Sequence, residues 1–223
     1  MRTLSELINL QEPAWPMVQE WLKRARNQHQ VLEVDTQRSE QVLVALQVTT
    51  RSPMGAITLE SGGIWFDHGW LRFLGGSGPR FGHDLASWNG LPGHKGATAV
   101  DGALVVAWDV AGGFFAINAG LFEGNPGDVY YFAADALQWE NLGVGYSGLL
   151  QWAVSCNLGE FYADVRWPSW KRDIESLTGD QGLVFHPPLY TQEAKLQPRC
   201  HHAVPIGELW QVARESIDAL ILA

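Results

Sequence analysis

Residues 103–142, ALVVAWDVAGGFFAINAGLFEGNPGDVYYFAADALQWENL, decide the fold class. Short apolar runs make up this stretch, and turn residues such as Gly112-Gly113 and Asn125-Pro126-Gly127 separate them: 103–108, 114–117, 129–132 and 137–142. Runs of this length are short for helices, and glycine-rich turns typically join neighbouring antiparallel strands. The stretch therefore predicts three or four sequential antiparallel strands.

Apolar residues at helical spacing lie on both sides of this stretch. They predict helices over 4–10, 17–28, about 36–46, 53–60, 85–88, 146–154, 169–177 and 206–222. Two further strand-like runs, 64–66 and 70–74, flank the turn Asp67-His68-Gly69, and 183–197 is expected to be an extended connector. Helices, then sheet, then helices is the order of an α+β protein. We expect N-terminal helices, a central antiparallel sheet and C-terminal helices.

Size and aromatic content predict a firm core. The chain has 223 residues, enough for one large domain, and eleven tryptophans. Each buried indole removes a large apolar area from water. Six of the tryptophans stand in apolar patterns and are expected in the core: Trp15, Trp21, Trp70, Trp108, Trp139 and Trp152.

Negative charge is concentrated in one part of the chain. Residues 96–164 contain eight carboxylates and no lysine or arginine, and the formal net charge is -9. This balance argues against nucleic-acid binding, which needs a basic surface. Uneven charge can mark a surface for a basic partner, or it can serve solubility alone. The residues that we expect to be exposed and to contact such a partner are Asp101, Asp109, Glu123, Asp128, Asp135 and Glu140.

The cell compartment expected from the sequence is the cytoplasm. No apolar run reaches the roughly 20 residues that span a bilayer, and the first residues, MRTLSELINLQEP, do not resemble a signal peptide. Two cysteines, Cys156 and Cys200, do not make a disulfide framework.

Catalytic and cofactor signatures are near misses, so we expect no cofactor, no metal and, on balance, no enzyme. Gly145-Tyr146-Ser147-Gly148-Leu149 lacks the last glycine of a nucleophile elbow, which makes Ser147 a helix N-cap. Cys200-His201-His202 offers soft ligands, but neighbouring side chains in an extended segment point in opposite directions. Asp67-His68 is open to two interpretations, an acid–base pair or a tight turn, and the turn is favoured.

Several segments together resemble the SUKH superfamily, which includes a yeast regulator of cell-wall synthesis and many bacterial immunity proteins. They are Gly62–Phe66 with Gly69–Gly75, Asp101–Asp109, Gly112–Asn118, Gly127–Phe132 and Trp139-Glu140, followed by the helix over 146–154. The chain also looks like a member of an uncharacterised bacterial domain family close to this group. The resemblance implies one SUKH-like domain over 1–223, with a core at about 15–156 and an extension at 157–223. The insertion 75–96 and the extension depart from the compact pattern.

Three functions remain open from the sequence. The resemblance implies a non-enzymatic binding protein of immunity type, which would hold a basic protein such as a toxin domain. The alternative is a small-ligand-binding protein or enzyme with a cleft at Gly75–Gly96, whose polar groups would come from His68, Arg80, His83 or His94. A structural or oligomeric module is the third, and the sequence leaves the oligomeric state open.

Overall fold

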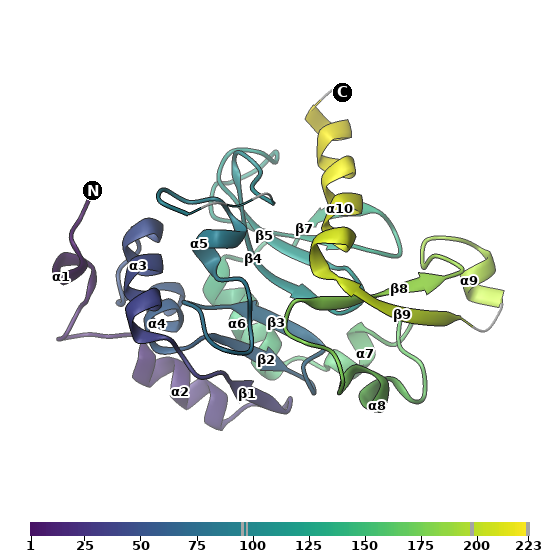
Figure 1. Ribbon diagram of the computed structural model, residues 1–223, viewed down its shortest axis with the longest axis horizontal. Coiled ribbons are helices and arrows are strands. Elements are labelled where there is room, and N and C mark those ends of the chain that lie inside the picture. The colour runs from purple at the N-terminus through teal and green to yellow at the C-terminus, as the bar shows by residue number, and fades with distance from the viewer. Residues whose placement is uncertain (95, 97, 197–198, 222–223) are drawn as a thin grey trace.

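The computed structural model describes residues 1–94, 96, 98–196 and 199–221 (Figure 1). Lys95 in the 75–96 loop lies outside them, as do Gln197 and Leu222, which end the predicted connector and the final helix. The helices are α1 (Leu4–Leu7), α2 (Trp15–Lys23), α3 (Thr36–Leu46), α4 (Pro53–Glu60), α5 (Leu85–Trp88), α6 (Tyr146–Ser155), α7 (Leu158–Phe161), α8 (Trp170–Ile174), α9 (Glu193–Leu196) and α10 (Ile206–Ile221). The α+β class is confirmed. None of the helices in the described ranges is long and apolar enough to cross a membrane.

The central sheet is a seven-stranded antiparallel meander in which every strand pairs with its neighbours in the sequence. Its strands are β1 (His29–Val31), β2 (Gly63–Phe66), β3 (Leu71–Leu74), β4 (Ala103–Asp109), β5 (Phe114–Asn118), β6 (Val129–Ala133) and β7 (Gln138–Asn141). The four strands expected within 103–142 are confirmed as β4 to β7. β1 was missed because the helical pattern was extended to residue 28, whereas α2 ends at Lys23. Arg26 N and Asn27 Nδ2 instead donate hydrogen bonds to carbonyls at the end of α6, which keeps these two residues out of a continued helix.

One row of large side chains crosses six strands of this sheet. The pairing places the members directly opposite each other from β2 to β7: Trp65, Arg72, Trp108, Phe114, Phe132 and Trp139. Cross-strand neighbours on one face lie close enough to pack, so the row forms an aromatic layer that includes one arginine. Trp108 and Phe114 are fully buried, and Trp139 is half-buried at the edge.

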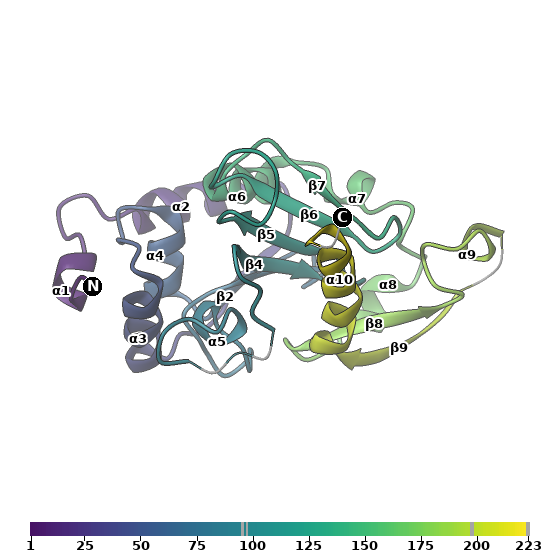
Figure 2. The ribbon, with the colours of Figure 1, turned by 90° about the horizontal axis from the view of Figure 1, so that it is seen from above.

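Helices cover both faces of the sheet (Figure 2). On the face that carries the row, Trp88 of α5 and Trp210 of α10 contact Phe114, and Trp210 also contacts Trp139. On the opposite face, α6 places Tyr146 against Phe73 and Trp152 against Phe115. Trp70 is also buried, whereas Trp15, Trp21 and Trp152 are half-buried against the same core.

The segment 157–221 is more ordered than predicted. Instead of an extended connector at 183–197, it contains an antiparallel hairpin of β8 (Gln181–His186) and β9 (Cys200–Pro205), with α9 in the connection between them. The two strands form a two-stranded sheet of their own, and Pro187-Pro188 begins the long connection. Ile174, Leu183 and Trp210 from this segment belong to the same hydrophobic core as the sheet.

Two further expectations about helices 4–10 and 146–154 were wrong in detail. α1 ends at Leu7, where Thr50 N donates to the Leu7 carbonyl. Ser147 is not the N-cap of α6, because the helix begins at Tyr146 and Gly145 occupies the cap. Ser147 is exposed in the first turn of the helix.

Arg72 joins the sheet to residues 157–221, the C-terminal segment. Its side chain is fully buried in the aromatic row, with the guanidinium over the Trp65 ring. Nε donates to Gly69 O, and Nη1 lies 2.7–2.9 Å from the carbonyl oxygens of Thr178, Gly179 and Gln181. Burial lowers the pKa of Arg72 to about 10, so the side chain remains charged at neutral pH. The charge is therefore held by the carbonyls that lead into β8.

Replacing Arg72 with methionine should destabilise the fold by about 3 kcal/mol, because four carbonyls lose a charged donor while the apolar volume is largely kept. Urea denaturation monitored by tryptophan fluorescence measures this change. Limited proteolysis should cut the variant first within residues 157–221.

Arg24→Met is the matched control, since Arg24 is exposed and, within the part of the chain that the structure describes, pairs with Glu20 alone. It should change the unfolding free energy by less than about 0.5 kcal/mol. If the two variants were equally stable, Arg72 would not be the tie between sheet and C-terminal segment.

Candidate functional site

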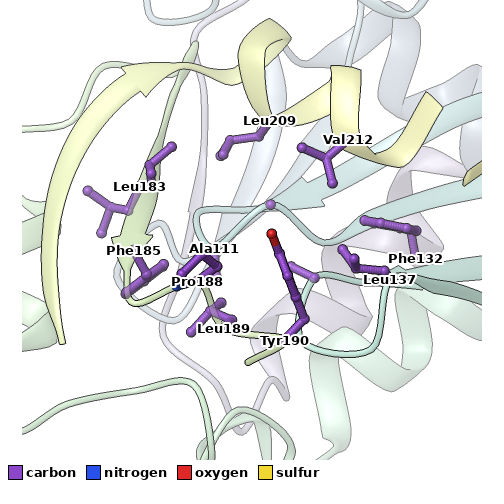
Figure 3. Close-up of a pocket in the computed structure, with 13 residues that line it drawn as sticks. Ala111, Phe132, Leu137, Leu183, Phe185, Pro188, Leu189, Tyr190, Leu209 and Val212 are labelled. Atoms are coloured by element: carbon purple, nitrogen blue, oxygen red, sulfur yellow. The ribbon is translucent and has the colours of Figure 1, made fainter. Parts of the chain in front are cut away.

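An apolar pocket lies where the C-terminal segment meets one end of the sheet (Figure 3). Its volume is about 210 Å³. The residues that line it are uncharged and almost all apolar: Ala111, Gly112, Phe132, Ala134, Leu137, Leu183, Val184, Phe185, Pro188, Leu189, Tyr190, Leu209 and Val212. Four parts of the chain contribute them, namely the β4–β5 turn, the β6–β7 hairpin, β8 with its following loop, and α10.

The β4–β5 turn forms the floor of the pocket, and Asp109 shapes this turn. Its Oδ1 accepts hydrogen bonds from the N–H groups of Ala111 (3.0 Å) and Gly113 (2.9 Å), and Oδ2 accepts one from the Tyr131 hydroxyl (3.0 Å). A Cβ atom at Gly113 would collide with this carboxylate, so glycine is required there. The turn thus presents Ala111 and Gly112 to the pocket in a fixed position.

The expectation that Asp109 is exposed is therefore wrong. The residue is 1% exposed, because it serves the turn that follows β4. Burial raises the pKa of Asp109, and the hydrogen bonds from Gly113, Tyr131 and Ala111 act in the opposite direction. Burial also raises the pKa of Tyr131 well above its ordinary value, so its hydroxyl stays protonated as a donor.

The other walls come from the C-terminal segment and from the β6–β7 hairpin. In Figure 3, Leu209 and Val212 extend from α10, Leu183 and Phe185 lie on the β8 side, and Phe132 and Leu137 lie on the opposite side. Gly182 allows this arrangement, since a side chain at that position would collide with Leu209. The pocket therefore exists only because α10 packs closely on β8.

The rim of the pocket combines exposed apolar groups with carboxylates. Tyr190 is 51% exposed and Val212 is 41% exposed. The exposed Asp135 lies in the β6–β7 turn between the wall residues Ala134 and Leu137. A polar hollow next to the pocket, which shares Leu189 with it, is lined by Asp135, Asp164 and Arg199 among others. An apolar group entering the pocket would thus pass close to negative charge.

The remaining predicted partner residues do not gather around this pocket. Asp101, Glu123 and Asp128 lie near the opposite end of the sheet, where β4 and β6 begin and β5 ends. Glu140 lies in β7, opposite Tyr131. Asp101, Glu123 and Glu140 are exposed, and Asp128 is half-buried and accepts a hydrogen bond from Asn141. The structure therefore brings only Asp135 of the six residues to the rim.

The groups expected in a cleft at 75–96 contact different parts of the molecule. The Arg80 guanidinium lies over Trp65, and His83 packs edge-on against Trp88. His68 lies outside that loop and contacts Trp170. Burial lowers the pKa of the partly buried His94. These contacts give no common site for the four groups.

The Cys200-His201-His202 segment lies in β9. His201 stacks near Trp167 and lies 3.7 Å from Asp173, whereas His202 is exposed. Across the described ranges, no three His, Cys, Asp or Glu side chains are grouped so that they could hold a metal ion. The expectation that purified protein carries no zinc at this segment stays a prediction, and elemental analysis would test it.

Sequence reasoning missed most of the pocket. Leu209 was placed on the apolar face of the last helix, but Leu183, Phe185 and Leu189 were assigned to a connector. The alternation of inward Leu183 and Phe185 with Val184 and the exposed His186 was a signal for β8. Nothing local indicated that the strand would face the β6–β7 hairpin.

Comparison with known proteins gives relatives of similar length. The uncharacterised protein YbfG of Escherichia coli strain K12 is 42% identical over 212 residues, which cover 95% of each chain. An uncharacterised protein of Haemophilus influenzae is 36% identical over 196 residues, or 88% of this chain and 86% of the relative. The family described as protein of unknown function DUF2625 matches residues 4–209. No solved structure shows significant similarity to the chain.

Replacing Asp109 with asparagine should change how stability depends on pH. Since burial raises the pKa of Asp109, the folded protein holds this proton more tightly than the unfolded chain. The free energy of unfolding contributed by the residue then falls as pH rises from about 4, the ordinary Asp value, through the raised value. The asparagine side chain does not titrate, so the wild type should lose stability relative to the variant over this range, as measured by urea denaturation at a series of pH values.

Asp109→Ala tests the turn itself at neutral pH. It leaves two buried N–H groups and one hydroxyl without their acceptor and should cost about 3 kcal/mol, whereas the exposed Asp101→Ala should cost less than about 0.5 kcal/mol. Equal losses in the two variants would contradict the role assigned to Asp109.

Proposed function

We propose that this chain, which belongs to the DUF2625 family of proteins of unknown function, is a non-enzymatic module that binds another protein. The partner would insert one apolar side chain into the pocket between the sheet and α10, and would place a basic side chain beside it, over Asp135 and Asp164. The apolar pocket with its acidic rim is the observation that carries the proposal.

The size of the pocket favours a side chain over a whole metabolite. Small-molecule sites typically enclose about 300–1,000 Å³, whereas an apolar cavity of about 150 Å³ already admits benzene. At about 210 Å³, this pocket fits a group such as a leucine, methionine or phenylalanine side chain. Anchors of this kind, seated in water-excluding pockets, supply much of the binding energy of protein interfaces.

The charge around the pocket favours a basic partner. Asp135 is exposed on the rim, and Asp164 is exposed at the adjacent hollow. Arg199 lies in the same hollow, where its Nη2 donates to the backbone carbonyl of Asp164 and not to the carboxylate. Rim carboxylates of this kind quicken association with a basic partner and select it, while the buried anchor sets the lifetime of the complex.

The resemblance to the SUKH superfamily is part of this proposal and names the class of partner that it implies, a basic toxin domain. This proposal assigns contact with the partner to a smaller part of the acidic surface than the sequence predicted. Asp109 is excluded by burial, and Asp135 is the member of the set that adjoins an apolar anchor site. Asp101, Glu123, Asp128 and Glu140 would contribute only a general negative field.

Photo-crosslinking in the bacterial host would test the proposal. A photoreactive phenylalanine analogue at Tyr190 on the rim should capture one protein with a basic interaction surface. The same analogue at Phe161 is the matched control, since Phe161 is similarly exposed, at 45%, but packs against Trp152 near α6. Val212→Trp, which fills the mouth of the pocket, should abolish the adduct at position 190. An adduct that persists in this variant would exclude the pocket as the anchor site.

Once the partner is purified, association kinetics would separate the rim from the wider surface. Asp135→Lys should slow association about tenfold at low salt and flatten its salt dependence. The double variant Asp128→Lys with Glu140→Lys, which changes the net charge by twice as much, should slow it less. The opposite ranking would show that the broad acidic surface, and not the rim, meets the partner.

A further inference from the structure

Another hollow, which shares no lining residue with the apolar pocket or with the hollow at Asp135, is lined mainly by polar and aromatic side chains. Its volume is about 610 Å³, within the range of small-molecule sites. The connection between α2 and β1, the β2–β3 turn and the chain around α7 and α8 provide its walls: Asn27, Asp67, Asn157, Gly159, Arg166, Trp167, Pro168, Trp170 and Lys171.

Asp67 and Arg166 form the charged base of this hollow. Arg166 Nη1 lies 2.6 Å from Asp67 Oδ2, and the two side chains are 7% and 16% exposed. The Arg166 guanidinium lies between rings, 4.0 Å from the centre of Trp170, 4.6 Å from Trp70 and 5.0 Å from Tyr162. The pair neutralises itself, so the base of the hollow carries both charges but little net charge.

Several features around this hollow are unfavourable for the stability of the fold. Asp67 and His68 adopt φ angles of 49° and 59°, where Asn-Gly would fit a tight hairpin turn with less strain. The Nε and Nη2 atoms of Arg166 are buried, and no described residue offers them an acceptor. Local costs of this kind concentrate at functional sites more than elsewhere in a fold.

The wall of the hollow offers hydrogen-bond acceptors beside the donors of Arg166 and Lys171. Asn27 Nδ2 donates to the carbonyls of Ala153 and Cys156, and Asn157 Nδ2 donates to the Glu160 carboxylate. Within the described ranges no group donates to the side-chain oxygen of either amide, so both oxygens are open to a ligand. Among the described residues no donor engages Asp67 Oδ1. An anion would be repelled by these three oxygens, and a cation by Arg166 and Lys171. A neutral molecule that donates several hydrogen bonds fits both restrictions.

We propose that this hollow binds a small neutral polyhydroxylated molecule, with the chemistry of a sugar. Its hydroxyl groups would donate to Asp67, Asn27 and Asn157 and accept from Lys171. Its C–H face would pack on the exposed parts of Trp167 and Trp170, since aromatic rings present a negative face to such groups. The site joins the β2–β3 turn to residues 157–171, so an occupant would brace the C-terminal segment against the sheet. The proposal does not depend on a protein partner at the apolar pocket.

Saturation-transfer NMR on the purified full-length protein would test the proposal. The probes are glucose, galactose, mannose and N-acetylglucosamine at millimolar concentration, with inorganic phosphate and spermidine as an anionic and a cationic probe. At least one sugar should receive saturation, quench tryptophan fluorescence and raise the melting temperature, because a ligand that binds only the folded state stabilises it. Phosphate and spermidine should not displace it.

Asn157→Ala should weaken the binding of that sugar about fivefold, the effect of losing one hydrogen bond of about 1 kcal/mol. Asn157 is exposed, so the variant should fold normally, and urea denaturation would check this. Asn125→Ala, at an exposed asparagine of the β5–β6 loop, is the matched control and should bind as the wild type does. The proposal fails if none of the sugars binds, if phosphate or spermidine binds in their place, or if Asn157→Ala binds the sugar unchanged.

Discussion

The buried guanidinium of Arg72 is the interaction on which the arrangement of the molecule depends. It stands in the aromatic row of the sheet, yet its hydrogen bonds run to the carbonyls of Thr178, Gly179 and Gln181. A buried charge without such acceptors would cost several kcal/mol. The charge is therefore tolerable only while residues 178–181 lie against β3, and this position directs β8, β9 and α10 onto the sheet. Arg166 makes the reciprocal connection, from the C-terminal segment back to Asp67 in the β2–β3 turn.

The apolar pocket and the proposed sugar site both lie along the junction that these two arginines hold. The apolar pocket needs the β4–β5 turn, which Asp109 fixes, and the close contact of α10 with β8 at Gly182. The proposed sugar site needs the turn at Asp67 and the chain that leads to Arg166. Neither half of the chain contains a whole site. The two proposed binding events therefore share one structural condition, which is that the C-terminal segment stays in place.

The sequence predicted what is locally specified. The strands within 103–142 are short and end at glycine turns, and each pairs with its neighbour in the chain, so local patterns sufficed. β8 and β9 were missed because Gln181–His186 pairs with Cys200–Pro205 across a long connection that begins with two prolines. From the distribution of charge we expected Asp109 on the surface. The two glycines that follow it, Gly112 and Gly113, indicated a turn, and a buried carboxylate can hold such a turn through hydrogen bonds to its N–H groups. The pockets could not be predicted, because their walls come from segments far apart in the sequence, which tertiary contacts such as those of Arg72, Arg166 and Trp210 bring together.

The position of α10 has a consequence for how the chain folds as it is made. The seven strands follow one another in the sheet, so their contacts are close in sequence and can form early in synthesis. Trp210 covers Phe114 and donates to Thr98 O, 112 positions earlier in the chain. Until the ribosome has released α10, Phe114, Phe132 and Trp139 therefore lack part of their cover, and the nascent sheet presents an apolar face to chaperones and to its own copies.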